Sequence, residues 1–487
     1  MKNLIKKHFL FLFFLIFYLG TLSIKLIYHP LPFYDWDEAI YMEVGREMIK
    51  NKSFIPLWQE KLWFDKPPLV MLLYGLIPKI SPLIEPEISA RLFNLFLTII
   101  FFIILYRLIL KITNSTLTAF LTVFLSSFTP LFIQRAHTVN MDVFLALGWW
   151  GYFLFYPNFL LSTLILSLAI FSKSLLGFYP LFIVFFYELF NFFIKKNDFK
   201  KFLNHAKNIL TQLILFSLWY LWMFLKFGYP FLYQHIYESH FKRVTASIEF
   251  HFGQRIFYFA ELAKQLDIFF YLSLLGLFLI FLLFTKKRIT FEKLFFLNLF
   301  LPWFLFLNLT KTKIYWYLYP AIPQFSLYVG FLVNFLQKRF HHNIPKKAVF
   351  IFALLAVSYF GIKKNNFFLT TFSSEDKYYQ MALYAKNHCQ KIYFLPEKSH
   401  RQAVSELEKM GLTITTTRFW GGHPALVYYT DNKIVFIYNF DKFKTRLKDI
   451  KEKECFSFFE NEIDEKIIKN KVKLIIKFED IILVKSL

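Results

Sequence analysis

Long apolar runs recur along this chain, and they restrict its fold more than any other feature does. A helix needs roughly 18 or more apolar residues to cross about 30 Å of hydrocarbon. Runs of about this length repeat from the first residues to about residue 362 of the 487. The sequence therefore predicts a polytopic α-helical membrane protein with about eleven spans, thirteen being the alternative count. These spans are expected at 9–28, 88–110, 116–134, 141–156, 158–172, 175–194, 208–226, 267–284, 291–309, 314–336 and 347–362.

The basic residues indicate the orientation of these spans. The first run has a basic start but no small-x-small cleavage pattern after it, so we expect an uncleaved helix with a cytoplasmic N-terminus. The formal net charge of +24 fits cytoplasmic loops of a membrane protein better than a nucleic-acid partner. Clusters at 195–207, 285–288 and 337–347 all fall inside by this count. The segments 29–87 and 227–266, and everything after 363, then lie outside.

Beyond residue 370 the apolar runs shorten and polar residues return. The patterns predict helices at 375–388 and 400–411, a strand at 391–395, a hairpin at 425–440 and two strands within 473–486. We therefore expect a transmembrane catalytic domain over 1–365 and an extracytoplasmic α/β domain over 366–487. Both cysteines, Cys389 and Cys455, fall in this second part. A disulfide in an oxidising compartment and two separate buried thiols are the two alternatives.

The first external segment, 29–87, contains an unusual group of acids in "YDWDEAIYMEVGREMIK". The apolar residues from Ile40 to Ile49 follow helical spacing, which predicts an amphipathic helix over 37–50 in the membrane interface. Its solvated face would carry Glu43, Arg46, Glu47 and Lys50, and Asp35 would lie in the approach to it. Asp37 is expected at the N-cap and Glu38 in the first turn. Helix capping alone would explain both acids.

A second short apolar stretch in the same segment weakens that simple explanation. In "LWFDKPPLVMLLYGL", Asp65, Lys66 and a Pro-Pro pair precede what we expect to be another interfacial helix. Two such helices, each opening on charged residues, would form a shelf beside a cleft. An unpaired lysine at this depth is costly unless it reaches water or an anion.

Other polar side chains recur at the outer ends of the predicted spans. Few cations are expected outside, so the external ones need a reason, and a bound phosphate supplies one. Such a site suits displacement at a sugar carbon with a lipid-linked phosphate as leaving group, where a carboxylate takes the proton of the attacking hydroxyl. The residues concerned include Arg135, His137, Asn140, Asp142, Lys173, Arg243, His251, Lys313 and Tyr317.

Seven stretches in order carry a family resemblance over about residues 30–330. They are DEAIYMEVGREM, FDKPP, RLFNLFLTIIFFIILYRL, RAHTVNMD, SKSLLG, HFGQR and KTKIYWYLYPAIP. The chain resembles bacterial GT-C membrane glycosyltransferases of the protein-mannosyltransferase and aminoarabinose (lipid A) transferase superfamily. The resemblance implies a polyprenyl-phosphate-sugar donor and inverting transfer at the outer face of the inner membrane. The count of spans from a cytoplasmic N-terminus places the C-terminal domain in the periplasm, and lipid A, a glycan and a protein hydroxyl stay open as acceptor.

The matching motifs also imply roles for individual residues. Asp37 and Glu38 match the acidic pair after the first span, with Asp37 as the leading candidate base, and Asp142 matches the second acid. Ile40 stands where several aminoarabinose transferases have Arg, and "KIY" replaces "KLP" in the late motif, so the sugar and acceptor stay open. The residues expected at the donor phosphate are Lys66, Lys173, Lys313 and Tyr317 by motif, together with Arg243 from the external cations.

Three alternatives compete with this hypothesis. "DWD" at 35–37 also matches the metal motif of nucleotide-sugar transferases, and a divalent metal near Asp37, His137 or His251 is conceivable, although no ligand spacing is diagnostic. A transporter or lipid flippase would show inverted repeats and charges at mid-span, whereas here the charges gather at one face. A catalytically dead relative would have lost the acids and Lys66, which are present.

Overall fold

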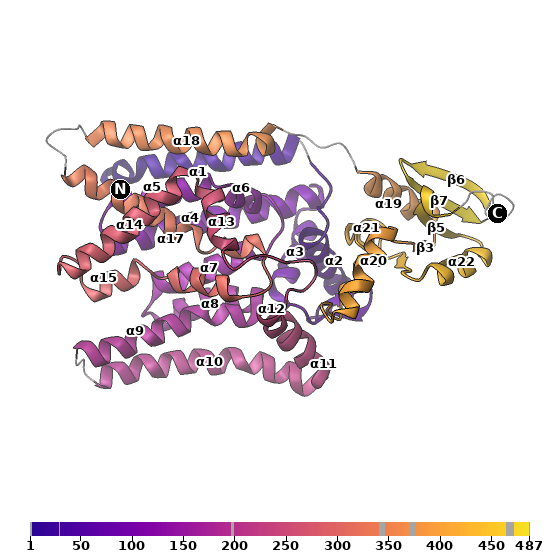
Figure 1. Cartoon of the computed structure of the whole chain (residues 1–487), viewed down its shortest axis with the longest axis horizontal. Coiled ribbons are helices and arrows are strands. Elements are labelled where there is room, and N and C mark those ends of the chain that lie inside the picture. Colours follow the sequence, from indigo (N-terminus) through magenta and orange to yellow (C-terminus); the bar gives the residue numbers. More distant parts are fainter. Residues whose placement is uncertain are drawn as a thin grey trace.

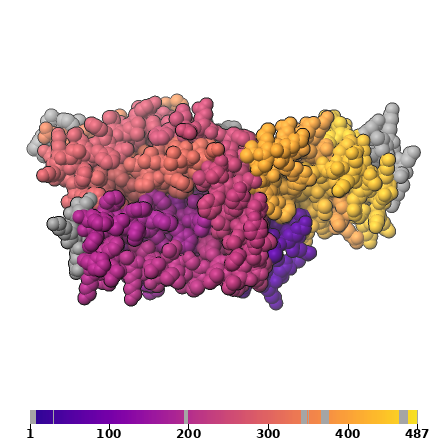
Figure 2. All heavy atoms as spheres, turned by 60° about the horizontal axis from the view of Figure 1, so that its bottom comes forward, coloured from indigo at the N-terminus to yellow at the C-terminus, as the bar shows by residue number. Residues whose placement is uncertain are grey.

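The computed structural model describes residues 2–28, 30–195, 199–339, 346–370, 376–463 and 472–486. A large helical bundle carries a smaller lobe at one end, and the smaller lobe contains the C-terminal sheet (Figures 1 and 2). The bundle consists of α1 (Lys2–Tyr28), α4 (Pro86–Thr113), α5 (Thr116–Ser127), α6 (Pro130–Ala136), α7 (Asp142–Phe155), α8 (Phe159–Lys173), α9 (Tyr179–Lys195), α10 (Phe199–Phe227), α13 (Phe257–Leu266), α14 (Ile268–Thr285), α15 (Phe291–Phe296), α16 (Leu301–Leu309), α17 (Ile322–Arg339) and α18 (Lys346–Thr370).

The number of helices that could cross a membrane differs from the number of predicted spans. Within the described residues, five helical segments are long and apolar enough to span, or six if α5 and α6, bent by 76°, count as one. One of the five, Phe159–Phe193, folds back on itself: Ser174 has φ 55°, and Gly177 packs against the backbone of Ile170. The predicted span at 291–309 is broken into α15 and α16. The predicted count of eleven therefore stays a prediction.

Two helices of the segment 29–87 lie at the end of the bundle that faces the smaller lobe (Figure 1). They are α2 (Asp37–Lys50) and α3 (Leu69–Ile80), joined by the short hairpin β1 (Leu57–Trp58) and β2 (Lys61–Leu62). The two helices cross at Gly45 and Gly75, where a Cβ on either residue would overlap the other helix's backbone. This close crossing requires glycine at both positions.

The structure corrects two expectations about α2. The helix begins at Asp37 and its cap residue is Trp36, so Asp37 is not the cap. The face that carries Glu43 and Glu47 was expected in solvent, but both side chains are buried. Glu47 accepts hydrogen bonds from the backbone N–H groups of Gln59 and Glu60 at 2.6 and 2.9 Å. Burial raises the pKa of Glu43 to about 8, against the opposing effect of Arg46, with which it pairs.

The C-terminal lobe contains a five-stranded mixed sheet in the order β4-β3-β5-β7-β6. Strands β4, β3 and β5 are parallel, with Ile392 opposite both Ile434 and Cys455, and β7 and β6 are antiparallel additions. Cys389 and Cys455 form a disulfide. The elements are α19 (Lys377–His388), β3 (Lys391–Phe394), α20 (Lys398–Lys409), α21 (Ala425–Tyr429), β4 (Ile434–Phe436), α22 (Phe440–Lys448), β5 (Glu454–Phe459), β6 (Val472–Phe478) and β7 (Ile481–Ser486).

The hairpin predicted at 425–440 is wrong. Its first half is the short helix α21, and only its second half pairs in the sheet, through β4 beside β3. Tertiary contacts decide this: the Tyr429 hydroxyl donates to Glu87 at 2.7 Å and accepts from the backbone N–H of Phe33 at 2.6 Å. The division into domains at residue 365 stays a prediction, and α18 itself continues to Thr370.

The segment from about residue 412 to residue 434 joins the C-terminal lobe to two loops of the bundle, 29–87 and 227–266. Asn432 Nδ2 donates to Glu47 at 2.8 Å, and the Thr416 hydroxyl donates to Asp65 at 3.0 Å. The backbone N–H of Thr415 lies 3.0 Å from both carboxylate oxygens of Glu238. Both of these loops therefore hold the lobe in place, and Glu43 and Glu47 of α2 are covered by protein rather than water.

Candidate functional site

The turn between α6 and α7 is built by asparagine side chains. Asn94 and Asn140 donate through Nδ2 to the backbone oxygen of Arg135, at 2.5 and 2.7 Å. Asn140 Oδ1 in turn accepts the N–H groups of Asp142 and Val143, at 2.9 and 3.2 Å, and so satisfies the start of α7. This network fixes the positions from which Arg135 and Asp142 extend.

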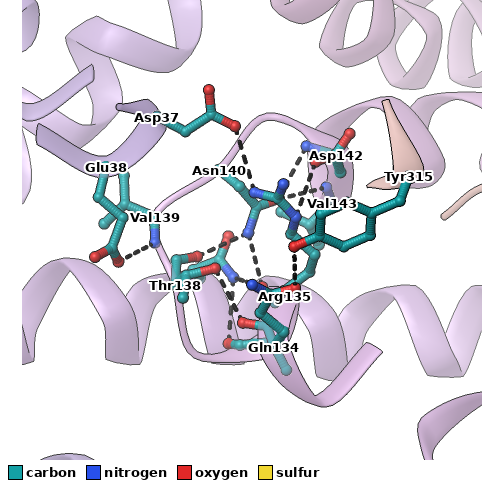
Figure 3. Close-up of polar contacts among 12 residues, drawn as sticks. Asp37, Glu38, Gln134, Arg135, Thr138, Val139, Asn140, Asp142, Val143 and Tyr315 are labelled. Carbon is teal, nitrogen blue, oxygen red and sulfur yellow. Dashed lines mark hydrogen bonds and ion pairs between the residues drawn. The ribbon is translucent and has the colours of Figure 1, made fainter. Parts of the chain in front are cut away.

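Arg135 lies between two of the predicted catalytic acids (Figure 3). Its Nη1 is 3.4 Å from Asp37 Oδ2, and its Nε is 3.4 Å from Asp142 Oδ2. Its guanidinium also stacks 4.6 Å from the centre of the Trp316 ring. Asp142 is paired a second time, with Lys173. The structure thus brings Asp37, Asp142 and Lys173 into one charge network, and Arg135 is its link.

Glu38 has a different environment from its neighbour Asp37. Arg91 donates to both Glu38 oxygens, through Nε at 3.0 Å and Nη2 at 2.7 Å. Backbone N–H groups of Val139 and Tyr34 supply two more bonds, at 2.7 and 2.8 Å. The Glu38 side chain is 3% exposed, and all four contacts hold it in place. A carboxylate engaged in this way is suited to positioning the start of α2 rather than to exchanging a proton.

Asp37 is the most accessible acid of this network. Its side chain is 30% exposed, and its contacts are long: Arg135 at 3.4 Å and the Tyr41 hydroxyl at 3.2 Å. Trp36, the residue before it, has φ 71° and ψ −119°, a conformation that non-glycine residues rarely adopt. Such strain persists only where the surrounding structure holds it, and it often marks a functional position.

Asp37, Glu38, Arg135 and Lys173 face a cavity of about 540 Å³ between the bundle and the C-terminal lobe, whereas the predicted acid Asp142 is not among the residues that line it. Its lining combines acids, cations and aromatic rings, as binding sites for amphipathic ligands do. Among the sequence-predicted site residues, the lining includes Asp37, Glu38, Lys66, Lys173, Arg243, His251 and Tyr317.

Lys66 is the cation in this cavity without a partner. Across the described parts of the chain it makes no hydrogen bond or ion pair, whereas Lys173 pairs with Asp142 and Arg243 lies 3.4 Å from Glu249. Burial, and then the nearby charge of Arg243, lower the pKa of Lys66 to about 8. An anion bound beside Lys66 would favour its charged form and so raise this pKa again.

Not every predicted residue reaches the cavity. Lys313 Nζ donates to the backbone oxygens of Leu307 and Asn308, at 3.1 and 3.0 Å, at the end of α16. The lining instead begins one residue later, with Ile314 and the short helix from Tyr315 to Leu318. Tyr317 is brought to the site, and its ring lies 5.1 Å from Lys173 Nζ.

The residues suggested for a metal do not converge. Asp37 and His251 both line the cavity, but buried His137 contacts the backbone oxygen of Ile133 and is outside the lining. In the portion of the chain that the structure describes, no three His, Cys, Asp or Glu side chains lie together as a metal site requires.

Sequence reasoning missed two kinds of site residue. Arg91 could have been recognised, because a lone arginine inside an apolar run is usually functional or paired. Arg135 lies at the outer end of a predicted span, and the sequence motifs imply no role for it. The residues that the C-terminal lobe adds to the cavity carry no local signal, and they are His400, Val404, Ile414, Thr417 and Trp420.

Comparisons with known proteins agree with the motifs. Residues 65–222 match a family model described as dolichyl-phosphate-mannose-protein mannosyltransferase. The crystal structure of ArnT from Cupriavidus metallidurans bound to undecaprenyl phosphate superposes with a TM-score of 0.64 at 13% identity, covering 99% of this chain and 98% of that one. The apo form of the same protein gives 0.68, also at 13% identity, covering 98% and 97%.

A more distant structure shares the same fold. The archaeal oligosaccharyltransferase AglB from Archaeoglobus fulgidus, in complex with an inhibitory peptide and a dolichol-phosphate, gives a TM-score of 0.59 at 12% identity. The match covers 88% of this chain and 64% of AglB. No curated protein sequence matches the chain. The resemblance predicted from the motifs is confirmed by the family model and the shared fold.

Proposed function

Because this chain has the fold of the GT-C membrane glycosyltransferases, we propose that it moves a sugar from a polyprenyl-phosphate donor to a cell-envelope hydroxyl. The single observation that carries the proposal is the pairing of chemistries in one cavity. An accessible carboxylate, Asp37, and a cation that pairs with no described residue, Lys66, both line it. A base and an anion-binding cation in one water-accessible cavity suit group transfer better than permeation.

In the proposed reaction the acceptor oxygen attacks the anomeric carbon of the donor sugar. The bond from that carbon to the phosphate oxygen breaks, and the phosphate leaves with the electron pair as polyprenyl phosphate. The proton of the attacking hydroxyl passes to the Asp37 carboxylate. Attack opposite the leaving group inverts the anomeric configuration. Phosphate leaves as a stable anion, so the cations assist and no general acid is required.

The remaining residues take positioning roles in this proposal. Lys66 is the leading partner of the donor phosphate, and Arg243, Lys173 and Tyr317 line the same cavity. Asp142 holds Lys173 and Arg135, and Arg135 in turn orients Asp37. We narrow the expected base to Asp37, because Glu38 is occupied by four donors. The contacts of Lys313 with α16 support a structural role for it.

The first test is Asp37→Asn, which keeps the shape of the side chain and removes the base. Transfer should fall by about 100- to 10,000-fold, the range for loss of a general base. Binding of polyprenyl phosphate should persist. The control is Glu85→Gln, an exposed carboxylate outside the cavity, which should transfer normally. Full activity in Asp37→Asn would overturn the assignment of the base.

The sugar and the acceptor need a separate measurement. Mass spectrometry of envelope glycolipids and glycoproteins from cells with and without the gene should reveal one glycan that loses a single residue. That species would distinguish lipid A, a glycan and a protein hydroxyl. Identical profiles in both strains would argue against transfer to any of the three.

A further inference from the structure

A second hollow of about 370 Å³ lies in the C-terminal lobe beside the main cavity. Its walls come from the start of α20, with Glu397, Ser399, His400 and Ala403, and from the turn Gly421–His423. His400 lines both this hollow and the main cavity. The two spaces are therefore neighbours that share a side chain.

Two glycines keep one wall of the hollow bare. Gly421 and Gly422 have φ of 59° and 84°, backbone angles that residues with side chains rarely adopt. A Cβ on Gly421 would overlap the Phe436 ring, and one on Gly422 would lie 3.4 Å from the His400 imidazole. Glycine is therefore favoured at both positions by the positive φ, and at Gly421 also by the Phe436 ring.

The hollow is tied to the candidate base through Asp35. His423 Nδ1 lies 2.9 Å from Asp35 Oδ2, and the backbone N–H of Ala425 donates to Asp35 Oδ1 at 3.0 Å. Asp35 lines the main cavity two residues before Asp37. A ligand bound against His423 would therefore contact a side chain that is itself paired with Asp35, and Asp35 precedes the strained Trp36 and the candidate base Asp37.

The lining chemistry differs from that of the main cavity. The hollow presents a carboxylate, a hydroxyl and two imidazoles, and none of its lining residues in the described chain is Lys or Arg. The cations suited to a phosphate, Lys66, Arg243 and Lys173, all line the other space. Burial lowers the pKa of His400, so its neutral ring has one donor and one acceptor nitrogen, of which Nε2 lies 3.4 Å from the Tyr438 hydroxyl. These groups suit a neutral ligand rich in hydroxyls.

We propose that this hollow binds a hydroxyl-rich glycan portion of the acceptor and directs one hydroxyl past His400 toward Asp37. The proposal rests on the transfer function above and adds the substrate class and the place of the acceptor. It separates the two substrates: the lipid phosphate lies with the cations of the bundle, and the glycan lies with the C-terminal lobe. The lobe would then be part of the active site rather than an appendage.

The test fills the hollow without touching the bundle. Ser399→Trp places a large side chain in the lining at an exposed position, and Ser405→Trp makes the same change on the same helix outside it. The full-length protein is reconstituted in lipid nanodiscs. The probe is a set of neutral oligosaccharides released from the cell envelope by mild acid and labelled with a fluorophore. Ser399→Trp should weaken binding by about tenfold or more, and Ser405→Trp should leave it unchanged.

Polyprenyl phosphate binding is measured on the same samples and should be equal in both variants. Three results would overturn the proposal: no glycan binding by the wild-type protein, equal binding in Ser399→Trp, or competition for the hollow by an unglycosylated Ser/Thr peptide. If polyprenyl phosphate binds but Ser399→Trp has no effect, only this inference fails. If polyprenyl phosphate does not bind at all, the proposed function itself is in error.

Discussion

The charge state of Lys66 makes a sharp prediction about pH. Its pKa is lowered to about 8 in the free protein, because the ammonium group is buried and lies near Arg243. A bound phosphate favours the charged form and should return the pKa toward the ordinary value of 10.5. Since the pKa is higher in the complex, binding takes up a proton once the pH exceeds 8. Affinity is therefore full below pH 8 and falls as the pH rises through that value.

The magnitude follows from the two pKa values. With 8 in the free protein and 10.5 in the complex, the affinity should fall about 30-fold between pH 7 and pH 9.5. The second ionisation of a phosphate monoester, near pKa 6, is largely complete across this range and contributes little. The assay is the dissociation constant of polyprenyl phosphate for the full-length protein in nanodiscs, measured at half-unit steps of pH.

The matched variant is Lys66→Arg, because a guanidinium stays charged throughout this range. Its affinity should change little between pH 7 and pH 9.5, whatever its absolute value at pH 7. Lys52→Arg, at an exposed loop lysine outside the cavity, should keep the pH dependence of the wild-type protein. A flat profile in the wild-type protein, or an equal fall in Lys66→Arg, would refute the link between Lys66 and the phosphate.

Three further predictions test the frame around the site. Arg91→Ala leaves Glu38 buried and without its ion pair, which should lower the free energy of unfolding by about 3–5 kcal/mol; an unchanged thermal midpoint would contradict this. Gly45→Val should force α2 and α3 apart at a cost of about 1–3 kcal/mol or more, whereas Gly20→Val, with open space around it, should be tolerated; equal yields of folded protein would argue against the glycine crossing. A reporter fused after Thr370 should be active only outside the cytosol, and cytosolic activity would reverse the proposed orientation.

Local patterns predicted much of the C-terminal lobe correctly. The helices α19 and α20 and the strands β3, β6 and β7 lie within a few residues of where periodicity placed them. Gly411 follows α20 with φ 69°, as its position after a helix suggests. These elements have amphipathic patterns that few competing structures would satisfy. The segment 425–429 has strand-like composition and is a helix, because its tyrosines pack and hydrogen-bond against the bundle.

In the bundle too, local pattern predicted where a helix lies, and tertiary contacts decided which of its faces are buried. The helical period predicted α2 with its bounds, but the same period put Glu43 and Glu47 in solvent. A sequence shows which residues share a helix face and does not show what covers that face. Here the external loop and the C-terminal segment cover it, with contacts such as that of Asn432 with Glu47 across 385 residues.

The sequence by itself determined the membrane class, the acids and cations at one end of the spans, and the order of motifs that led to the GT-C fold. It could do so because apolar length, charge bias and residue type are local properties. Only the tertiary structure decided that Asp37 stays accessible while Arg91 pairs with Glu38, and that Lys313 bonds to the end of α16. It also decided that Lys66 pairs with none of the residues that the structure describes. It also placed His400 between two spaces. Each of these facts depends on which distant side chains compete for the same atoms, and that competition exists only in the folded chain.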